Sequence, residues 1–234
     1  PEDANRAVVR TLYAGVCGSD RGIWFRTAFK AMILDSLRDD RKTCRVIGHE
    51  LVGEVVEIGS RARNRYRVSE GQVVAAESHI VCERCYQCRV GESHVCSETK
   101  IIGISADGCF AEYVKLPASV LWPTDPSKIR FEVAGVQEPF GNAVHACTKV
   151  DLRGRTVAIF GCGTIGLFTV MIARALGAAK VFGVEPNPRN REMATTLGAD
   201  AMIAPSVAAK GAPTAWEADP AVVHALHDAT GGVG

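Results

Sequence analysis

Four cysteines lie close together near the middle of the chain. They are separated by two, two and seven residues: Cys82, Cys85, Cys88 and Cys96. Thiolates at this spacing can converge on one tetrahedral metal ion, and four sulfur ligands with no open position are typical of structural zinc. The residues between them are mostly polar, so they would gain little from apolar burial and would have to fold around the ion. We therefore predict a zinc lobe over about residues 80–98, with two disulfides or free thiols as the alternative.

A second set of metal-ligand residues is spread over three short motifs. These are Cys17-Gly18-Ser19-Asp20 after a predicted strand, Gly48-His49-Glu50 at the start of another, and Glu138-Pro139. One thiolate, one imidazole and one carboxylate would leave a position open for water or substrate, as catalytic zinc sites do. Taken singly, such a cysteine is more often a small buried apolar residue, and such a histidine a hydrogen-bonded core residue. The residues alone leave both interpretations open.

A glycine-rich loop between a predicted strand and a predicted helix indicates a nucleotide site. Its residues are Gly161, Cys162, Gly163, Thr164, Ile165 and Gly166. In such a loop the first glycine makes the tight turn, the second admits a pyrophosphate, and the third lets the helix approach the strand. The free amides and positive dipole at the helix start then favour phosphate. The sequence predicts a dinucleotide site here, with an ordinary flexible turn as the alternative.

An acidic residue at the end of the next strand bears on which dinucleotide binds. Glu185 follows the predicted strand over 180–184. A carboxylate at this position can accept hydrogen bonds from the ribose hydroxyls, so we predict NAD rather than NADP. Arg189 argues weakly against this, because a guanidinium could bind a 2′-phosphate. The alternative for Glu185 is an ordinary solvated carboxylate at a strand end.

The pattern of strand and helix signals along the chain predicts an α/β protein with two domains. Short β-rich runs between turns are typical of a compact β-domain. They are expected over residues 7–12, 51–58, 72–76 and 110–116. After a helix over 133–148, strand and helix signals alternate, which indicates a doubly wound parallel sheet. The strands are expected over 157–160, 180–184 and 201–203, and the helices over 165–176, 189–197 and 216–229. We place the domains at 1–132 and 133–234 and expect the second to be incomplete at its C-terminal end.

Composition and charge exclude several classes of partner. The 234 residues are 47% hydrophobic and include 27 basic and 26 acidic side chains. A net charge near zero creates no field that favours nucleic acid or a membrane surface, so a small neutral molecule or a nucleotide is the expected partner. The charge-free stretch over 156–173 contains the three loop glycines and is therefore not predicted to span a membrane. The first ten residues show no apolar signal segment, so we expect a cytoplasmic protein.

The order of these motifs resembles that of the zinc-dependent medium-chain dehydrogenases, and the similarity covers nearly the whole chain. Three further segments are most similar to those of L-threonine 3-dehydrogenases, with sorbitol and butanediol dehydrogenases as close relatives. The segments are GESHVC at 91–96, GCFAEY at 108–113 and EPFGNAVH at 138–145. The resemblance implies a GroES-like catalytic domain followed by a Rossmann domain. It also implies that a C-terminal return to the catalytic domain lies outside this chain.

The resemblance also implies roles for individual residues. Cys17 and His49 would be catalytic zinc ligands, with Glu50 and Glu138 sharing the remaining protein position. Asp20 would orient His49, and Ser19 would hydrogen-bond the substrate oxygen. The implied reaction is hydride transfer from a secondary alcohol to NAD, with L-threonine as the first substrate hypothesis and a polyol or diol as the alternative. Two zinc ions per chain and a homo-oligomer are implied as well.

Two features depart from this family pattern. Many relatives carry a histidine three residues after the serine or threonine, where it helps to pass the alcohol proton to solvent, whereas this chain has Gly22. The loop over 21–46 is longer than usual and has apolar residues at near-helical spacing. We interpret this loop as an amphipathic helix packed on the β-domain, or alternatively as a reshaped substrate pocket. Because of Gly22, a protein that binds zinc and nucleotide without catalysing a reaction remains an alternative.

Overall fold

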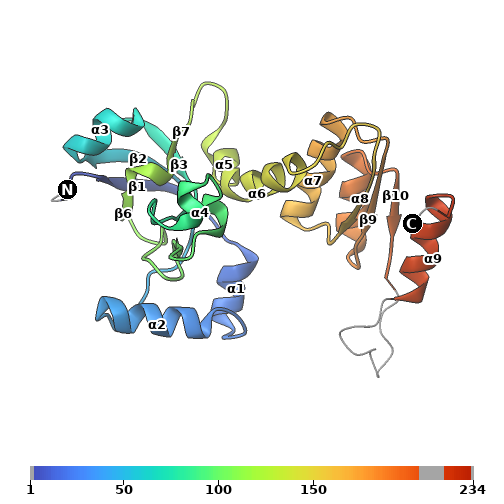
Figure 1. Ribbon diagram of the computed structural model, residues 1–234, viewed down its shortest axis with the longest axis horizontal. Helices are drawn as coiled ribbons and strands as arrows, with labels where there is room; N and C mark the ends of the chain where they lie inside the picture. Colours follow the sequence, from blue (N-terminus) through green and yellow to red (C-terminus); the bar gives the residue numbers. More distant parts are fainter. Residues whose placement is uncertain (1–2, 206–218, 233–234) are drawn as a thin grey trace. The chain divides into compact units, whose positions relative to one another are not determined.

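The computed structural model describes residues 3–205 and 219–232, and the chain divides into two compact units. The first unit spans Pro1–Glu138 and the second Pro139–Gly234. Figure 1 shows both units, and each is described by itself below.

The first unit is built on a five-stranded antiparallel sheet. Its strands are β1 (Arg6–Gly15), β2 (Glu50–Ile58), β3 (Val73–Ala76), β6 (Tyr113–Pro117) and β7 (Leu121–Pro123). They lie in the order β6-β1-β2-β3-β7. Fully buried side chains such as Val9, Val55 and Val74 fill its core. The strands predicted over 7–12, 51–58 and 72–76 therefore all form, because short runs rich in β-branched residues between turns give a strong local signal.

Smaller elements surround this sheet. They are α3 (Ser60–Tyr66), β4 (His79–Ile80), α4 (Tyr86–Arg89), a 3-10 turn over Ser93–Val95, β5 (Lys100–Ile101), a second 3-10 turn over Ala118–Val120 and α5 (Phe131–Ala134). Strands β4 and β5 form a separate antiparallel pair at the base of the cysteine-rich segment. The helix predicted over 133–148 is divided in two: α5 ends at Ala134, and α6 covers Gln137–Thr148.

The strand predicted over 110–116 begins only at Tyr113. The residues before it pair with another irregular segment: the N–H groups of Gly108, Cys109 and Phe110 donate to the carbonyls of Val46, Gly48 and Ile47 at 2.8, 2.9 and 3.0 Å. This long-range pairing gives the segment its backbone hydrogen bonds outside the sheet, so it need not continue the strand.

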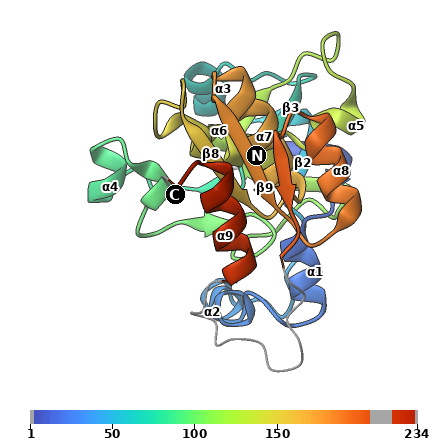
Figure 2. The same cartoon turned by 90° about the vertical axis from the view of Figure 1, so that its right-hand side faces the viewer.

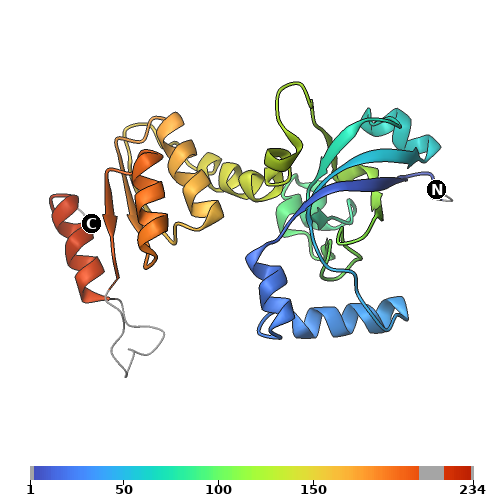
Figure 3. The ribbon, with the colours of Figure 1, turned by 180° about the vertical axis from the view of Figure 1, so that it is seen from behind.

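Two helices cover much of the long loop over 21–46: α1 (Gly18–Trp24), which begins before it, and α2 (Lys30–Asp40). The expectation that apolar residues pack α2 on the sheet is wrong, because the only buried residue of α2 is Ser36. The large apolar residues of the loop are 37–78% exposed: Trp24, Phe25, Phe29, Met32 and Leu34. Figure 3 shows α1 leading away from the sheet and α2 lying apart from it. Polar contacts fix α2 instead: the buried guanidinium of Arg45 donates to Asp40 at 2.8 Å and to Ser36 at 3.0 Å.

The second unit is a parallel sheet with helices on both faces. Its elements are β8 (Thr156–Phe160), α7 (Thr164–Ala175), β9 (Lys180–Val184), α8 (Pro188–Thr196), β10 (Ala201–Ile203) and α9 (Pro220–Ala229). The strand order β10-β9-β8 is that of half a doubly wound sheet. Figure 2 looks onto this unit, and Figures 1 and 3 agree that α7 and α8 cover one face and α9 the other.

The alternating elements predicted from the sequence therefore form. Residues 216–218 of the last predicted helix lie outside the described residues, and α9 begins at Pro220. The charge-free stretch over 156–173 forms β8, the glycine loop and most of α7. Among the described residues, no helix combines the length and the apolar character needed to cross a bilayer.

Candidate metal and dinucleotide sites

Cys17, His49 and Glu50 come together in the first unit. One ligand atom from each lies within 4.8 Å of the other two. The register of the sheet explains this, because β1 and β2 are antiparallel neighbours and Gly15 is paired with Glu50. Cys17 follows the end of β1 as the N-cap of α1, and His49 directly precedes the start of β2. The predicted group is thus assembled where one strand ends and its neighbour begins.

Close backbone packing holds the turn that carries His49. Gly48 has a φ of +91°, a conformation that favours glycine. A Cβ at Gly103 or at Gly108 would overlap the backbone of Gly48, and a Cβ at Gly48 would overlap the ring of Phe110. The position of His49 therefore depends on residues about 60 positions further along the chain.

Two polar residues surround the imidazole. Asp20 Oδ2 accepts a hydrogen bond from the Cys17 N–H at 2.9 Å, and Asp20 Oδ1 lies 3.9 Å from His49 Nδ1. Ser19 Oγ lies 3.4 Å from His49 Nε2, on the other side of the ring. Asp20 Oδ1 and His49 Nδ1 are buried without a hydrogen-bond partner among the described residues. A shift of about 1 Å would bring them to hydrogen-bond distance, which is the arrangement that orients a ligating histidine.

The electrostatics of this group favour a cation. Glu50 is only 6% exposed, and burial raises the pKa of its carboxyl. The charge of His49 and a hydrogen bond from Cys17 lower that pKa, whereas the charges of Glu138 and Asp20 raise it. Buried carboxylates with like-charged neighbours are stabilised by a bound cation. A thiol, an imidazole and a carboxyl in this setting fit zinc.

Glu138 belongs to a neighbouring group rather than to the first one. Its carboxylate, that of Glu77 and the ring of His79 have ligand atoms within 4.8 Å of one another. Ser78 Oγ donates to Glu138 Oε1 at 2.6 Å, and His79 Nδ1 lies 2.6 Å from Glu77 Oε1. The hydrogen bond with Glu77 raises the pKa of His79. Sequence reasoning missed the run 77–79, although acidic, hydroxyl and imidazole side chains directly after a strand were a usable signal.

The four cysteines of the lobe also converge. One sulfur from each lies within 4.8 Å of the other three, and none of the nine cysteines, all in the described part of the chain, forms a disulfide. Main-chain N–H groups point at the sulfurs, from Cys82 to Cys96 Sγ at 3.4 Å and from Cys85 to Cys82 Sγ at 3.3 Å. Main-chain hydrogen bonds from Cys88 and Ser97 lower the pKa of the Cys85 thiol to about 6. Burial instead raises the pKa of the Cys88 thiol to about 12, so the convergence of the four sulfurs, rather than their ionisation, is what fits a structural zinc.

The glycine loop has the shape that a pyrophosphate requires. Gly161 has a φ of +88°, and a Cβ at Gly166 would overlap the carbonyl oxygen of Gly161, so the helix approaches the loop closely. Gly163 is the N-cap of α7, and the space that a Cβ would fill there is open. Thr164 and Ile165 are exposed in the first turn of α7. The open glycine and the helix start fit a dinucleotide.

Glu185 is buried and faces the loop. Its Oε2 accepts a hydrogen bond from the Cys162 N–H at 2.7 Å, and its Oε1 accepts one from the Asn187 N–H at 2.8 Å. The alternative of a solvated carboxylate is therefore wrong, because Glu185 is only 6% exposed. Arg189 is exposed near the start of α8. The ribose contact predicted for Glu185 stays a prediction.

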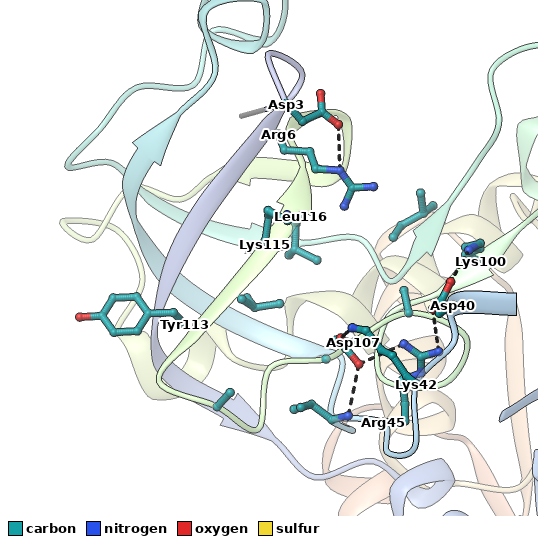
Figure 4. A pocket seen from close by; sticks show the side chains of 16 residues that line it. Asp3, Arg6, Asp40, Lys42, Arg45, Lys100, Asp107, Tyr113, Lys115 and Leu116 are labelled. Carbon is teal, nitrogen blue, oxygen red and sulfur yellow. Dashed lines mark hydrogen bonds and ion pairs between the residues drawn. The ribbon is translucent and has the colours of Figure 1, made fainter. Parts of the chain in front are cut away.

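A separate pocket of about 620 Å³ lies in the first unit, and none of the candidate ligands lines it. Figure 4 shows that charged side chains surround it. Arg45 Nη1 donates to Asp107 Oδ1 at 3.0 Å, Lys42 pairs with the same carboxylate, and Lys100 Nζ lies 3.4 Å from Asp40 Oδ1. These ion pairs connect Asp40, at the end of α2, and Asp107 with the basic side chains that line the pocket.

Comparison with known families gives two matches along the chain. The family described as "Alcohol dehydrogenase GroES-like domain" matches residues 3–126, and the one described as "Zinc-binding dehydrogenase" matches residues 164–234. The L-threonine 3-dehydrogenase of Caldanaerobacter subterraneus is 39% identical over 201 residues, which are 86% of this chain and 55% of that protein. The enzyme of the same name from Symbiobacterium thermophilum is 41% identical over 199 residues, covering 85% of this chain and 54% of that protein. The chain therefore spans about half the length of these relatives.

Solved structures show the same architecture. The alcohol dehydrogenase of Thermus sp. ATN1 superposes with a TM-score of 0.76 at 26% identity, covering 98% of this chain and 61% of that one. Galactitol-1-phosphate dehydrogenase from Escherichia coli superposes with a TM-score of 0.73 at 26% identity, covering 86% of this chain and 54% of that one. A short chain alcohol dehydrogenase from Escherichia coli, complexed with NADH, superposes with a TM-score of 0.75 at 27% identity, covering 98% of this chain and 60% of that one. The predicted fold class, a GroES-like β-domain followed by a Rossmann sheet, is confirmed.

Proposed function

Because this chain belongs to the zinc-dependent medium-chain dehydrogenase family, we propose that it is the zinc- and NAD-binding part of an enzyme that oxidises a secondary alcohol. The observation that carries the proposal is the convergence of Cys17, His49 and Glu50 within 4.8 Å beside the hydroxyl of Ser19. This ligand set leaves a coordination position for the substrate oxygen.

The chain's own residues would divide the work as follows. Cys17, His49 and Glu50 hold the catalytic zinc, and Glu138 is the nearby carboxylate that exchanges with Glu50. When bound, zinc supplies a Lewis acid for the substrate hydroxyl, and NAD supplies the hydride acceptor. Asp20 fixes the imidazole, and Ser19 Oγ receives the hydroxyl proton.

The remaining residues bind the second zinc and the dinucleotide and take no part in the reaction itself. The four lobe cysteines hold a second zinc. The dinucleotide is held by Gly161, Gly163, Thr164, Ile165 and Gly166, with Glu185 at the ribose and Arg189 at the edge of that site. Gly22 cannot carry a proton, so Ser19 would release it to water or to another group.

For the substrate, we propose an L-threonine-like 2-amino-3-hydroxy acid. Relatives at about 40% identity are named L-threonine 3-dehydrogenases, which supports this choice. A polyol or diol is the second candidate, because a solved neighbour with the same architecture is a galactitol-1-phosphate dehydrogenase. A small-molecule alcohol is the common element of both. The homo-oligomer and the cytoplasmic location stay predictions.

The test is a substrate panel on the zinc-loaded protein in its complete form. NADH formation is measured with L-threonine, sorbitol and 2,3-butanediol, and L-threonine should give the highest kcat/KM. Cys17→Ser should abolish turnover and lower the zinc content from two ions to one per chain, whereas Cys44→Ser, which changes an exposed cysteine outside both groups, should do neither. No NADH formation with any secondary alcohol would contradict the proposal and favour a non-catalytic zinc- and nucleotide-binding protein.

A further inference from the structure

We propose that Glu185 is a positioning residue that holds the glycine loop in its cofactor-binding shape. As a consequence, removing its carboxylate weakens NAD and NADP together instead of exchanging one for the other. This inference rests on the proposed dinucleotide function and concerns what this carboxylate does before any cofactor arrives.

The contacts of Glu185 tie two segments of the second unit together. One carboxylate oxygen accepts from the Cys162 N–H at 2.7 Å and the other from the Asn187 N–H at 2.8 Å. The first of these bonds joins residues 23 positions apart and is buried. Both oxygens are therefore engaged by main-chain donors that belong to the two turns around the predicted dinucleotide site.

The carboxylate also lies at the start of two helices. Asn187 is the N-cap of α8, and Cys162 directly precedes Gly163, the N-cap of α7. Helix starts carry partial positive charge and free N–H groups, which a buried anion stabilises. Charge-assisted bonds of this kind are about twice as strong as neutral ones.

The other contacts of the loop fix its ends and bury the Cys162 side chain, and Glu185 provides the acceptor for the Cys162 main-chain N–H. The Gly161 N–H donates to the Val184 carbonyl at 2.8 Å, and Gly166 packs against the Gly161 carbonyl. The Cys162 side chain is fully buried and anchors one side of the loop in the core. Without Glu185, the buried Cys162 N–H would have no acceptor, and an unsatisfied buried amide favours a rearranged loop.

This arrangement predicts an unusual result for cofactor choice. If the carboxylate only repelled a 2′-phosphate, its neutralisation would improve NADP binding. Here neutralisation also loosens the loop that binds the pyrophosphate, which NAD and NADP share. The loss at the pyrophosphate therefore exceeds the gain at the 2′-phosphate, and NADP binding weakens as well.

The experiment compares Glu185→Gln with Glu192→Gln, a matched change at an exposed glutamate on α8. In the cofactor-free protein, hydrogen exchange of the Cys162 amide should accelerate at least about tenfold in Glu185→Gln, and the dissociation constants of both NAD and NADP, from calorimetry, should rise at least about tenfold. Glu192→Gln should change neither quantity. Glu185→Asp keeps the charge but is one methylene too short to reach both amides. It should lose NAD affinity and still reject NADP.

Each other outcome overturns the inference. Tighter or unchanged NADP binding by Glu185→Gln would show that the carboxylate acts only on the 2′ position. Unchanged exchange at Cys162 would show that it does not hold the loop. The exchange measurement needs no cofactor and therefore tests the contact between Glu185 and the loop by itself. A wild-type protein that binds neither dinucleotide would refute the proposed function instead. Thermal unfolding of each variant checks that the fold is intact.

Discussion

The two candidate zinc groups of the first unit are built in opposite ways. The lobe takes all four ligands from 15 consecutive residues, and only Cys96 among them is buried. The group at Cys17 takes its ligands from two strand ends, and His49 and Glu50 are each 6% exposed. In the lobe the metal provides the folding energy, whereas at Cys17 the folded sheet provides the geometry. The first should collapse without its ion, and the second should persist.

The largest effect is expected from losing a lobe ligand. Cys88→Ser should remove one of two zinc ions and leave residues 82–96 without protection from hydrogen exchange, because apparent binding energies of structural zinc reach about 10–16 kcal/mol. The strands of the sheet should keep their protection. Elemental analysis and exchange mass spectrometry check both points, with Cys44→Ser as the control. A protected lobe that holds no zinc would contradict the comparison.

The next largest effect is expected from the close contact between Gly108 and Gly48, which holds the turn of His49. Gly108→Ala should lower the free energy of unfolding by about 3 kcal/mol, because the added methyl overlaps the Gly48 carbonyl oxygen. Urea denaturation measures this loss. Gly135→Ala, where the nearest atom lies 3.5 Å from the new Cβ, should change stability little. If both variants unfold alike, the glycine contact does not hold the turn of His49.

A smaller effect is expected for a substitution that lowers the zinc affinity of one group and not of the other. Asp20→Asn should weaken zinc binding at the Cys17 group by about tenfold to a hundredfold, because it perturbs the hydrogen bond to Cys17 and the orientation of His49. The lobe zinc should be unaffected. Competition with a chromophoric chelator resolves two affinities in the same sample. Equal weakening of both ions would indicate a general loss of fold.

The smallest effect is a pH dependence of the metal-free protein. Burial raises the pKa of Glu50 above its ordinary 4.5, so the folded protein holds this proton more tightly than the unfolded chain. Ionisation of Glu50 therefore destabilises the metal-free fold as pH rises above about 4.5. Metal-free Glu50→Gln should be about 1 kcal/mol more stable than wild type at pH 7, and the order should reverse with zinc. Thermal unfolding across pH measures this, and a metal-free variant no more stable than wild type would contradict it.

The sequence was enough to predict the elements and motifs that neighbouring residues form, but not the contacts between segments far apart in the chain. The four cysteines, the glycine loop and the alternating strands are each recognisable from neighbouring residues, and all of them form. The pairing of 108–110 with 46–48 and the inward orientation of Glu185 depend on segments far apart in the chain. Periodicity predicted α2 but not what holds it, because Arg45 fixes that helix through ion pairs.

The compactness of the cysteine lobe sets an order of events during synthesis. All of its ligands leave the ribosome together, so the lobe can capture an ion as soon as Cys96 emerges. The turn of His49 waits for Gly103 and Gly108, which are translated later. If both groups hold zinc as proposed, a nascent chain would load the lobe before the group at Cys17 has formed.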